Sequence, residues 1–583
     1  MTCKFRRGTL NTPPPPPPPP PPPQSLYCPP PGPPGSLKIT DLNNDCLDLV
    51  LSHFQLIELV RLRVVCRQWY KLCTYKMSSC RYFSTVTFKD RPIGWNLREK
   101  YADRIVDDVL AMLSLIGRNL KTISLSKAVG LNAKDLSLMA EMLPNLQELD
   151  LRFCCKFDKT LAQVIGHKIC PSIECLRLRP FHPKHINMLL KRSRKLKFFS
   201  ITSFDCYHEQ SNDSDSDDYA DSDSSFDDPD SILHLKDCLS AENPLISVCF
   251  PRFHELHPES MCYVFESFAK TLQHVDLSYT YLQGLTNCSS NLPQLTNMKT
   301  FIAPNRPKGT GLRHSFGQPH LQNQCADQLL SVVQLMPNLR VLDLTGNDHV
   351  PSRRHDFVEI LSKSCPLLEE LFLGCCCIPA ETLVNLQKLV FLRRLYLDHH
   401  SATFETRKYD FAASFKSIAT LVLPHLKELE YFSLTHSTAF WADTFTGRSV
   451  DEHDLFQFVK NAGPKFKDLF VGAANKHYDG DQYDFVAKAV EMCSALDRNG
   501  MIRIFVENLD EAQRSASLTD HFDSISPPFL KVIFPYPHYM EKLHSCDVLG
   551  RYIDLPNFFP PPATRELRAH ASWLGFFEDR GSR

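Results

Sequence analysis

The hexamer LQELDL, residues 146–151, decides the fold of this chain because it is one member of a series. Apolar residues stand at its first, fourth and sixth positions. One such hexamer indicates nothing, since any amphipathic strand or helix can produce it. Eleven copies in order are far more specific: LKTISL from Leu120, LQELDL from Leu146, IECLRL from Ile173, LKFFSI from Leu196, LQHVDL from Leu272, MKTFIA from Met298, LRVLDL from Leu339, LEELFL from Leu368, LRRLYL from Leu392, LEYFSL from Leu429 and FKDLFV from Phe466.

The spacing of the copies is that of a structural repeat. The first three intervals are 26, 27 and 23 residues, and degenerate copies stand near Leu245, Ile502 and Leu530. Helix-like stretches such as LNAKDLSLMAEMLP follow the hexamers. One copy cannot bury its apolar stripe alone, but stacked copies can, each strand pairing with the next and each helix closing the back. We therefore expect an α/β leucine-rich-repeat solenoid, a horseshoe with parallel strands on its concave face.

The turn after each hexamer indicates the class of repeat. Cys154, Asn347 and Cys376 stand three residues beyond the last apolar position, and Cys-Pro pairs precede two hexamers. We expect such turn residues to hydrogen-bond buried backbone between coils or to fill a small space there. The pattern resembles the cysteine-containing class of leucine-rich repeats, so we interpret Cys375–Cys377 as packing residues and not as a metal site.

Composition and charge exclude several classes of protein. The 583 residues carry 65 Lys plus Arg against 66 Asp plus Glu, so the net charge of -1 favours neither nucleic acid nor a membrane surface. No apolar run is long enough to span a bilayer, and the N-terminus lacks the apolar core of a signal peptide. The 22 cysteines are then expected to be reduced thiols in a cytoplasmic or nuclear protein.

Three segments differ from the rest in composition. Residues 1–36 are rich in proline, including the run Pro13–Pro23, and are either a ligand for SH3, WW or profilin-type modules or a disordered spacer. An acidic insertion at 207–232 is too charged and too poor in apolar residues to fold. Its candidate phosphorylation sites have an acid three residues on and are Ser214, Ser224 and Ser225. Residues 536–583 form a tail without an assignment.

A further apolar stretch, DLNNDCLDLVLSHFQLIELVRLRVVCRQWYKL at 41–72, precedes the repeats. Its apolar residues recur at intervals of three and four, which predicts helices, and Asp41, Asn43 or Asn44 could cap the first one. Helices this short bury little surface alone, so they need a neighbour. The second half, ELVRLRVVCRQWYKL, resembles the centre of an F-box. Asn43 stands where that family has a proline, which is expected to loosen the helix start.

The order of the segments resembles the F-box and leucine-rich-repeat proteins. We divide the chain into an F-box at 37–85, a linker or helical cap at 86–118 and repeats at 119–535. The resemblance implies a substrate-recognition subunit of an SCF-type E3 ubiquitin ligase, whose F-box binds a Skp-type adaptor and, through it, cullin and RING subunits. The adaptor-binding positions carried over from the motif are Leu42, Leu47, Val50, Leu51, Leu59, Leu62, Val65, Cys66 and Trp69. Some of these must instead form the core of the domain itself.

The substrate surface is expected on the strands of the repeats. Residues between the inward leucines face the concave side. The candidates on that side are Arg152, Arg177, Arg179, Asp343, Phe372, Arg394, Tyr396 and Asp398. In type, the aromatic residues beside arginines resemble protein-binding hot spots. The alternative function is a non-degradative scaffold that recruits partners through the proline tract and the repeat face.

Catalytic motifs are not found. HELH at 254–257 is one residue short of the zinc motif HExxH, and there is no phosphate-binding loop or GxSxG. We expect no catalytic residues, no metal and no cofactor. The chemistry of ubiquitin transfer and proteasomal degradation would then belong to partner subunits.

Overall fold

The structure is a computed structural model of the chain. It describes residues 43–51, 54, 59, 62–84, 106, 109–125, 132–152, 157–179, 181–201, 232–251, 256–257, 259–278, 292–304, 329–345, 347, 356–374, 378–397, 411–434, 450–471, 484–497, 500–506, 521–522 and 524–533. The chain folds as two compact units, Met1–Met77 and Ser78–Arg583.

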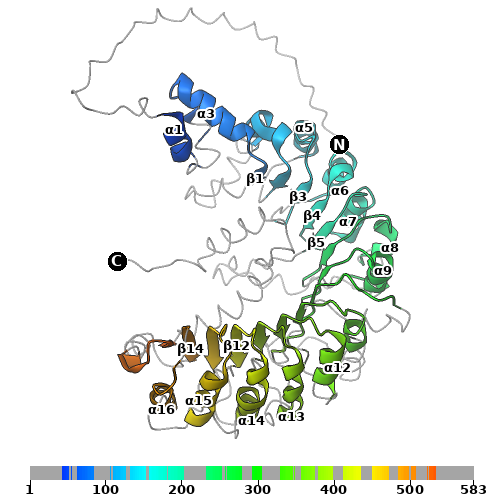
Figure 1. Ribbon diagram of the computed structural model, residues 1–583. Helices are drawn as coiled ribbons and strands as arrows, with labels where there is room; N and C mark the ends of the chain where they lie inside the picture. Colours follow the sequence, from blue (N-terminus) through cyan, green and yellow to red (C-terminus); the bar gives the residue numbers. More distant parts are fainter. Residues whose placement is uncertain are drawn as a thin grey trace, which may run out of the picture. The chain divides into compact units, whose positions relative to one another are not determined.

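The second unit is built on one parallel sheet of 15 strands in chain order (Figure 1). Each strand pairs only with its neighbours in the sequence, so the order of the strands in the sheet is their order in the chain. The strands are β1 Tyr82–Ser84, β2 Thr122–Ser124, β3 Glu148–Asp150, β4 Cys175–Leu178, β5 Phe198–Ile201, β6 Ser247–Cys249, β7 His274–Asp276, β8 Thr300–Ile302, β9 Val341–Asp343, β10 Glu370–Phe372, β11 Arg394–Tyr396, β12 Tyr431–Leu434, β13 Asp468–Val471, β14 Ile502–Val506 and β15 Leu530–Ile533.

The repeat prediction is confirmed strand by strand. In all eleven hexamers the strand begins at the third residue, as β3 does in LQELDL, and the degenerate copies become β6, β14 and β15. The register keeps equivalent positions opposite each other, for example Leu149 beside Leu176. One strand was not predicted: β1 pairs with β2 although its sequence has no leucine hexamer.

Helices lie on one face of this sheet (Figure 1). They are α5 Ala133–Met142, α6 Lys159–Lys168, α7 Pro183–Leu190, α8 Leu235–Cys238, α9 Glu259–Phe268, α12 Phe357–Ser364, α13 Ala380–Leu383, α14 Phe411–Ser417, α15 Glu452–Asn461 and α16 Asp484–Cys493. Short turns of helix accompany them at η4 Gly117–Asn119, η5 Cys170–Ser172, η9 Val384–Lys388, η11 Ile418–Val422 and η12 Leu423–His425. Side-chain caps fix several starts; Asn132 and Asp135 form a capping box on α5.

The apolar positions of the hexamers form the core between sheet and helices. In LRVLDL, residues Leu339, Leu342 and Leu344 are each at most 1% exposed. The helices contribute their own inward residues, such as Leu361 and Phe357 of α12. Burying a side chain of this size contributes roughly 1.5–3 kcal/mol, and stacking the repeats supplies that burial on both sides of every coil.

The turn residue Asn347 connects one coil to the next, as expected. Asn347 donates from Nδ2 to the carbonyl oxygens of Ala303 at 2.8 Å and Leu344 at 3.0 Å. Cys365, of one Cys-Pro pair, lies with Sγ 3.6 Å from the carbonyl oxygen of Val333 in the preceding coil. These polar contacts satisfy backbone groups that the turns leave without a strand or helix partner.

The first unit contains two described helices, α1 Asn44–Leu51 and α3 Arg67–Ser78. Its buried residues are Leu47, Leu51, Leu59, Trp69, Cys73 and Met77. Trp69, Cys73 and Met77 are spaced four apart on α3 and therefore share one face of that helix. The side chain of Gln68 donates from Nε2 to Oδ1 of Asn44 at 3.0 Å, which joins the two helices at their N-terminal turns.

Candidate partner-binding surfaces

Buried ion pairs lie on the first strands of the sheet. Arg152 holds Asp150 with two contacts, 2.9 Å from Nε to Oδ1 and 2.6 Å from Nη2 to Oδ2. Burial acts to raise the pKa of Asp150, but Arg152 and its hydrogen bonds outweigh burial, and the net pKa is lowered. On the neighbouring strand Nη1 of Arg177 lies 3.7 Å from Oε2 of Glu148. Burial raises the pKa of Glu148 in spite of this partner.

Aromatic rings form a ladder across β10 to β14. Phe372 stacks on Tyr396 with ring centroids 4.3 Å apart, and Tyr396 lies 4.5 Å from Tyr431. Tyr431 lies 4.9 Å from Phe470, which stacks on Phe505 at 4.2 Å. Phe372 lies opposite Tyr396 in the register, and Phe470 lies opposite Phe505. Tyr431 stands two residues earlier on its strand than the partner of Tyr396 and links the two pairs diagonally, which is within reach of aromatic rings. The ladder is therefore a continuous apolar band on five successive strands.

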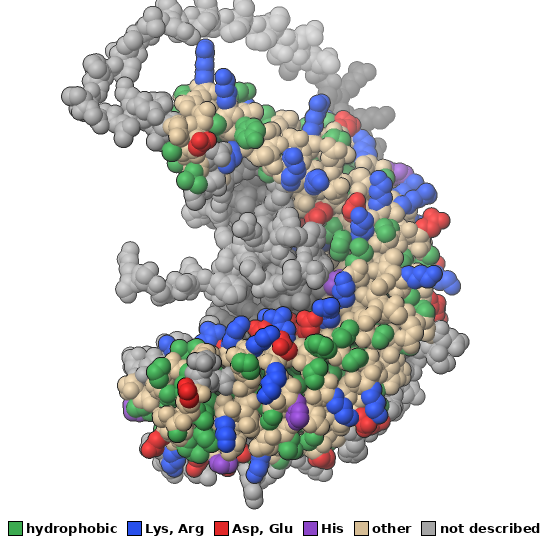
Figure 2. All heavy atoms as spheres, in the orientation of Figure 1, with side chains coloured by type: hydrophobic (Ala, Val, Ile, Leu, Met, Phe, Trp, Pro, Cys, Tyr) green, Lys and Arg blue, Asp and Glu red, His purple; other side chains and the backbone are tan. Residues whose placement is uncertain are grey.

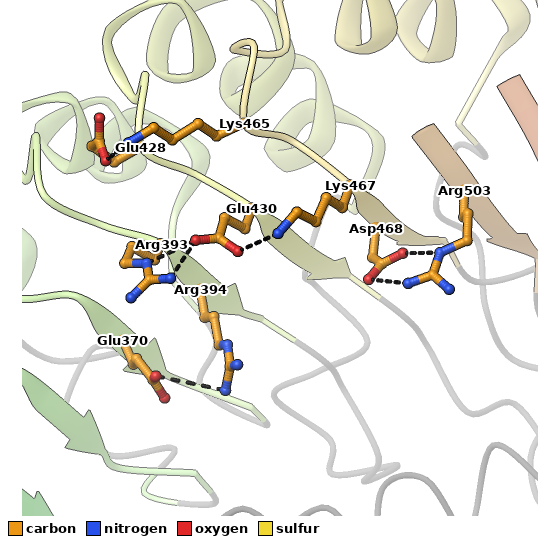
Figure 3. A network of polar contacts seen from close by, with 9 residues as sticks. All are labelled: Glu370, Arg393, Arg394, Glu428, Glu430, Lys465, Lys467, Asp468 and Arg503. Atoms are coloured by element: carbon orange, nitrogen blue, oxygen red, sulfur yellow. Dashed lines mark hydrogen bonds and ion pairs between the residues drawn. The ribbon is translucent and has the colours of Figure 1, made fainter. Parts of the chain in front are cut away.

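A network of ion pairs joins residues on and directly before the strands β10 to β14 (Figure 3). Glu430, directly before β12, accepts from Arg393 at 2.5 Å and from Lys467 at 2.9 Å. Asp468 accepts two bonds from Arg503 at 2.6 and 2.8 Å. In each pair the cation is the more exposed partner; for Lys467 and Glu430 the side chains are 62% and 23% exposed. Figure 2 shows basic and acidic side chains mixed along this part of the unit.

Apolar side chains also lie at the surface of the first unit. Val64 is 88% exposed, Val65 57% and Val50 37%. Tyr70 is exposed beside them in sequence, with Arg63 stacked 4.8 Å from its ring centroid. Figure 2 shows hydrophobic side chains at the surface of α1 and α3. A small helical unit with a buried core and this much exposed apolar surface has the properties of a docking module.

A comparison with known protein families identifies the domain in the first unit. The F-box domain family matches residues 39–80. This segment is an F-box domain. The sheet that follows it is a leucine-rich-repeat solenoid, so the chain joins the two elements in the order that the sequence predicts.

Two further comparisons concern solved structures and curated proteins. Among solved structures, a chain from the "Crystal structure of Rad7 and Elc1 complex in yeast" matches with 12% sequence identity and a TM-score of 0.29. The match covers 75% of this chain and 93% of that chain. A comparison with curated proteins found no match.

The structure divides the expected adaptor-binding residues of the F-box domain into two groups. Leu47, Leu51, Leu59 and Trp69 are at most 6% exposed, so we reassign them from the docking surface to the core of the domain. Val50 and Val65 are exposed, and Leu62 and Cys66 are half-buried. Leu42 lies outside the described residues. The helical pattern could not separate these groups, and it also missed the exposed residues Leu49, Val64, Tyr70 and Tyr75.

Asn43 corrects the expectation of a loosened helix start. Its Oδ1 accepts a hydrogen bond from the backbone N–H of Cys46 at 2.7 Å. Leu47 N–H donates to the carbonyl oxygen of Asn43 at 3.0 Å. This is the geometry of an N-cap, and asparagine is among the best residues for it. Asn43 therefore stabilises the start of α1 where the family has a proline.

The expected substrate-binding residues also divide. Arg179 and Arg394 are exposed, as expected for a binding face. The expectation of exposure is wrong for five residues, each at most 5% exposed: Arg152, Arg177, Asp343, Phe372 and Tyr396. Arg152 pairs with Asp150 just before it in the chain, whereas Arg177 and Phe372 contact residues of adjacent strands. These contacts account for part of the burial. Asp398 and the serines Ser214, Ser224 and Ser225 lie outside the described residues.

Metal-binding and membrane features can be judged for the described residues alone. Within them no group of three or more His, Cys, Asp or Glu side chains could hold a metal ion. No helix there is long and apolar enough to cross a membrane. Ten described cysteines are free thiols, but Cys262 is disulfide-bonded, contrary to the expectation of thiols throughout. Cys154 and Cys375–Cys377 lie outside the described residues.

Proposed function

We propose that the chain is the substrate-recognition subunit of an SCF-type E3 ubiquitin ligase. The observation that carries the proposal is the F-box domain at 39–80, whose exposed apolar residues offer a surface for helices of a Skp-type adaptor. Cullin and RING subunits would join through that adaptor. The chain itself would be non-catalytic, with the transfer of ubiquitin carried out by its partners.

The adaptor surface that we propose consists of Val50, Val64, Val65 and Tyr70, with Leu62 and Cys66 at its margin. Val64, which is 88% exposed, would contribute roughly 1.5–3 kcal/mol when buried by a partner, and the less exposed Val50 and Val65 would contribute less. Leu47, Leu51, Leu59 and Trp69 would support the surface from inside.

The substrate surface that we propose lies on the strand side of the solenoid, where the aromatic ladder and the ion-pair network share the strands β10 to β14. Aromatic and arginine side chains dominate binding energy at protein interfaces. Arg394 and Arg503 each form an ion pair and are about half exposed. Arg503 also lies 5.7 Å from the ring centroid of Phe505. The residues proposed to contact substrate are Arg394 and Arg503 on the strands of the ladder, and Arg179 directly after β4.

Co-purification tests the adaptor role. The tagged full chain should capture a Skp-type adaptor and a cullin from cell extract. Replacing both Val50 and Val65 by aspartate should weaken adaptor binding by roughly tenfold or more, because two charges would be buried at the interface. The matched control is Leu138→Asp, an exposed apolar position on α5.

Two outcomes are distinguishable. Loss of adaptor and cullin in the valine variant alone, with an unchanged circular dichroism spectrum, supports the receptor function. If the folded wild-type chain captures neither protein, the receptor function is wrong. The alternative of a non-degradative scaffold then becomes the hypothesis to pursue.

A further inference from the structure

A basic cavity lies on the solenoid at the edge where its first strands begin. Its volume is about 380 Å³, and its charged lining residues are Arg81, Arg118, Lys121, Lys195 and Glu174. Four cations against one carboxylate give the lining a net charge of +3. These charged residues come from the turns that lead into β1, β2, β4 and β5, and uncharged residues of the turn before β3 complete the lining.

The single acid of the cavity is already neutralised. Glu174 accepts an ion pair from Lys197 at 2.8 Å, and Lys197 is not part of the lining. In the part of the chain that the structure describes, Arg81, Arg118, Lys121 and Lys195 take part in no ion pair. The positive charge around the cavity is therefore not compensated by neighbouring side chains.

Uncompensated positive charge is not a general property of the residues that precede the strands, as the later repeats show. The residues directly before β9 to β13 are Arg340, Glu369, Arg393, Glu430 and Lys467, and their charges alternate. Arg340 pairs with Glu369 at 2.6 Å, and Glu430 pairs with both Arg393 and Lys467. The equivalent positions before β1 and β2 are Arg81 and Lys121, with no acid between them. Among the described residues, the charged side chains directly before the strands are therefore ion-paired at β9 to β13, whereas Arg81 and Lys121 before β1 and β2 are not ion-paired.

Hydrogen bonds hold the backbone of the turns that line the cavity. Lys121 N–H donates to the carbonyl oxygen of Arg81 at 2.8 Å, and Gln147 N–H donates to that of Lys121 at 2.8 Å. The side chain of Asn145 donates to the carbonyl oxygen of Arg118 at 2.8 Å. Nη1 of Arg81 lies 3.2 Å from the carbonyl oxygen of Ser78, which orients a guanidinium that has further N–H donors. The cationic side chains therefore extend from turns whose backbone is held by hydrogen bonds.

We propose that this cavity binds a phosphate group that carries about two negative charges. Lys and Arg are the usual partners of phosphate, and a phosphate ester near pH 7 carries about -1.5 to -2, more than a single carboxylate. Several cations around one concavity repel each other, and a doubly charged anion relieves that repulsion. The cavity has room for such a group and for part of the molecule that bears it. The site shares no residue with either surface of the proposed function.

Calorimetric titration of the full chain at low salt tests the site with three probes. Inorganic pyrophosphate represents a free phosphate compound, and a phosphoserine peptide represents a phosphorylated side chain. The unphosphorylated peptide is the control for contacts that do not involve phosphate. Binding of pyrophosphate alone assigns a free phosphate compound, and binding of the phosphopeptide but not its unphosphorylated form assigns a modified protein. Either result supports the site.

Two double variants with the same loss of charge separate the site from general electrostatics. Lys121→Gln with Lys195→Gln removes two cations of the cavity. Lys270→Gln with Lys460→Gln removes two exposed cations outside the lining. We expect binding to fall roughly tenfold or more in the first and to stay within about twofold of wild type in the second.

All four side chains in these variants are exposed, so both proteins should fold, and equal melting temperatures without ligand check this. The proposal is wrong if the wild-type chain binds neither pyrophosphate nor the phosphopeptide. It is also wrong if the cavity variant binds as wild type does, or if both double variants lose binding equally. Adaptor capture by the F-box domain is independent of all these outcomes.

Discussion

Asn347 and Ala303 are 44 residues apart, yet the side-chain amide of the first donates to the backbone carbonyl oxygen of the second at 2.8 Å. Asn347 is 8% exposed and also donates to Leu344 at 3.0 Å. One amide group therefore satisfies carbonyl groups in two successive coils. The bond links the coil of β8 to the coil of β9 and so helps to fix how these coils stack.

Replacing Asn347 by alanine should lower the free energy of unfolding by about 1–3 kcal/mol, because two buried carbonyl groups would lose a donor. Asn338→Ala is the matched control. Its side chain makes the same type of bond, to the carbonyl oxygen of Thr296 at 2.7 Å, but at an exposed position where water can replace it. Urea unfolding followed by circular dichroism measures both. Equal effects in the two variants would contradict the role assigned to Asn347.

The repeats were predictable because their signal is redundant. Each hexamer alone is weak, but LQELDL, LRVLDL and LEELFL share the apolar pattern, a following helix and a Cys or Asn three residues beyond the last leucine, so errors at one copy do not change the fold. Strand β1 escaped prediction because its sequence, YFS, has no leucine. Its position in the sheet depends on pairing with β2, which is a tertiary contact.

The binding surfaces were less predictable than the fold. Strand periodicity places Phe372 and Tyr396 on the correct face but does not say that they stack on each other. That depends on register between repeats, and the unequal spacing of the hexamers hides the register. In the F-box domain, Leu51 and Val50 both fit a helical apolar pattern, but one is in the core and the other is exposed. The distinction requires the packing of the helices, which the motif does not contain.

This distinction between Leu51 and the exposed valines can be tested directly. Leu51→Ala leaves a cavity and should destabilise the F-box domain by about 2–5 kcal/mol, whereas Val65→Ala should change its stability by less than about 0.5 kcal/mol. Hydrogen exchange of the α3 amides in the full chain, followed by mass spectrometry, measures both. Faster exchange in the Val65 variant would show that this residue belongs to the core.

The cysteines should differ in reactivity according to burial. Burial raises the pKa of the thiols of Cys170 and Cys365 to about 12, whereas Cys46 is at the surface. At pH 7.5 a thiol with that pKa is ionised in roughly one molecule in 10⁴ or fewer, and the thiolate is the reactive form. Iodoacetamide should therefore modify Cys46 in the native protein and should reach Cys170 and Cys365 only after unfolding. Mass spectrometry of the peptides checks this order, and early labelling of Cys365 would contradict it.

His274 should make the stability of the solenoid depend on pH. It is 3% exposed on β7, and its Nδ1 lies 3.1 Å from Oγ1 of Thr300. Burial, with a smaller effect of Lys299, lowers the pKa of its imidazole to about 4. The ordinary value is about 6.5, so between about pH 4 and pH 6.5 the unfolded chain binds the proton that the folded chain excludes. The stabilisation due to neutral His274 is therefore complete above about pH 6.5 and is lost as the pH falls toward 4.

The comparison of wild type with His274→Gln isolates this group from the carboxylates, which titrate in both proteins. From pH 7.5 to pH 4.5 we expect wild type to lose on the order of 2 kcal/mol more unfolding free energy than the variant. His425→Gln, at an exposed position, is the matched control for loss of a histidine. Urea unfolding at several pH values measures the three curves. Parallel curves for wild type and His274→Gln would mean that His274 takes up its proton in the folded chain as readily as in the unfolded one.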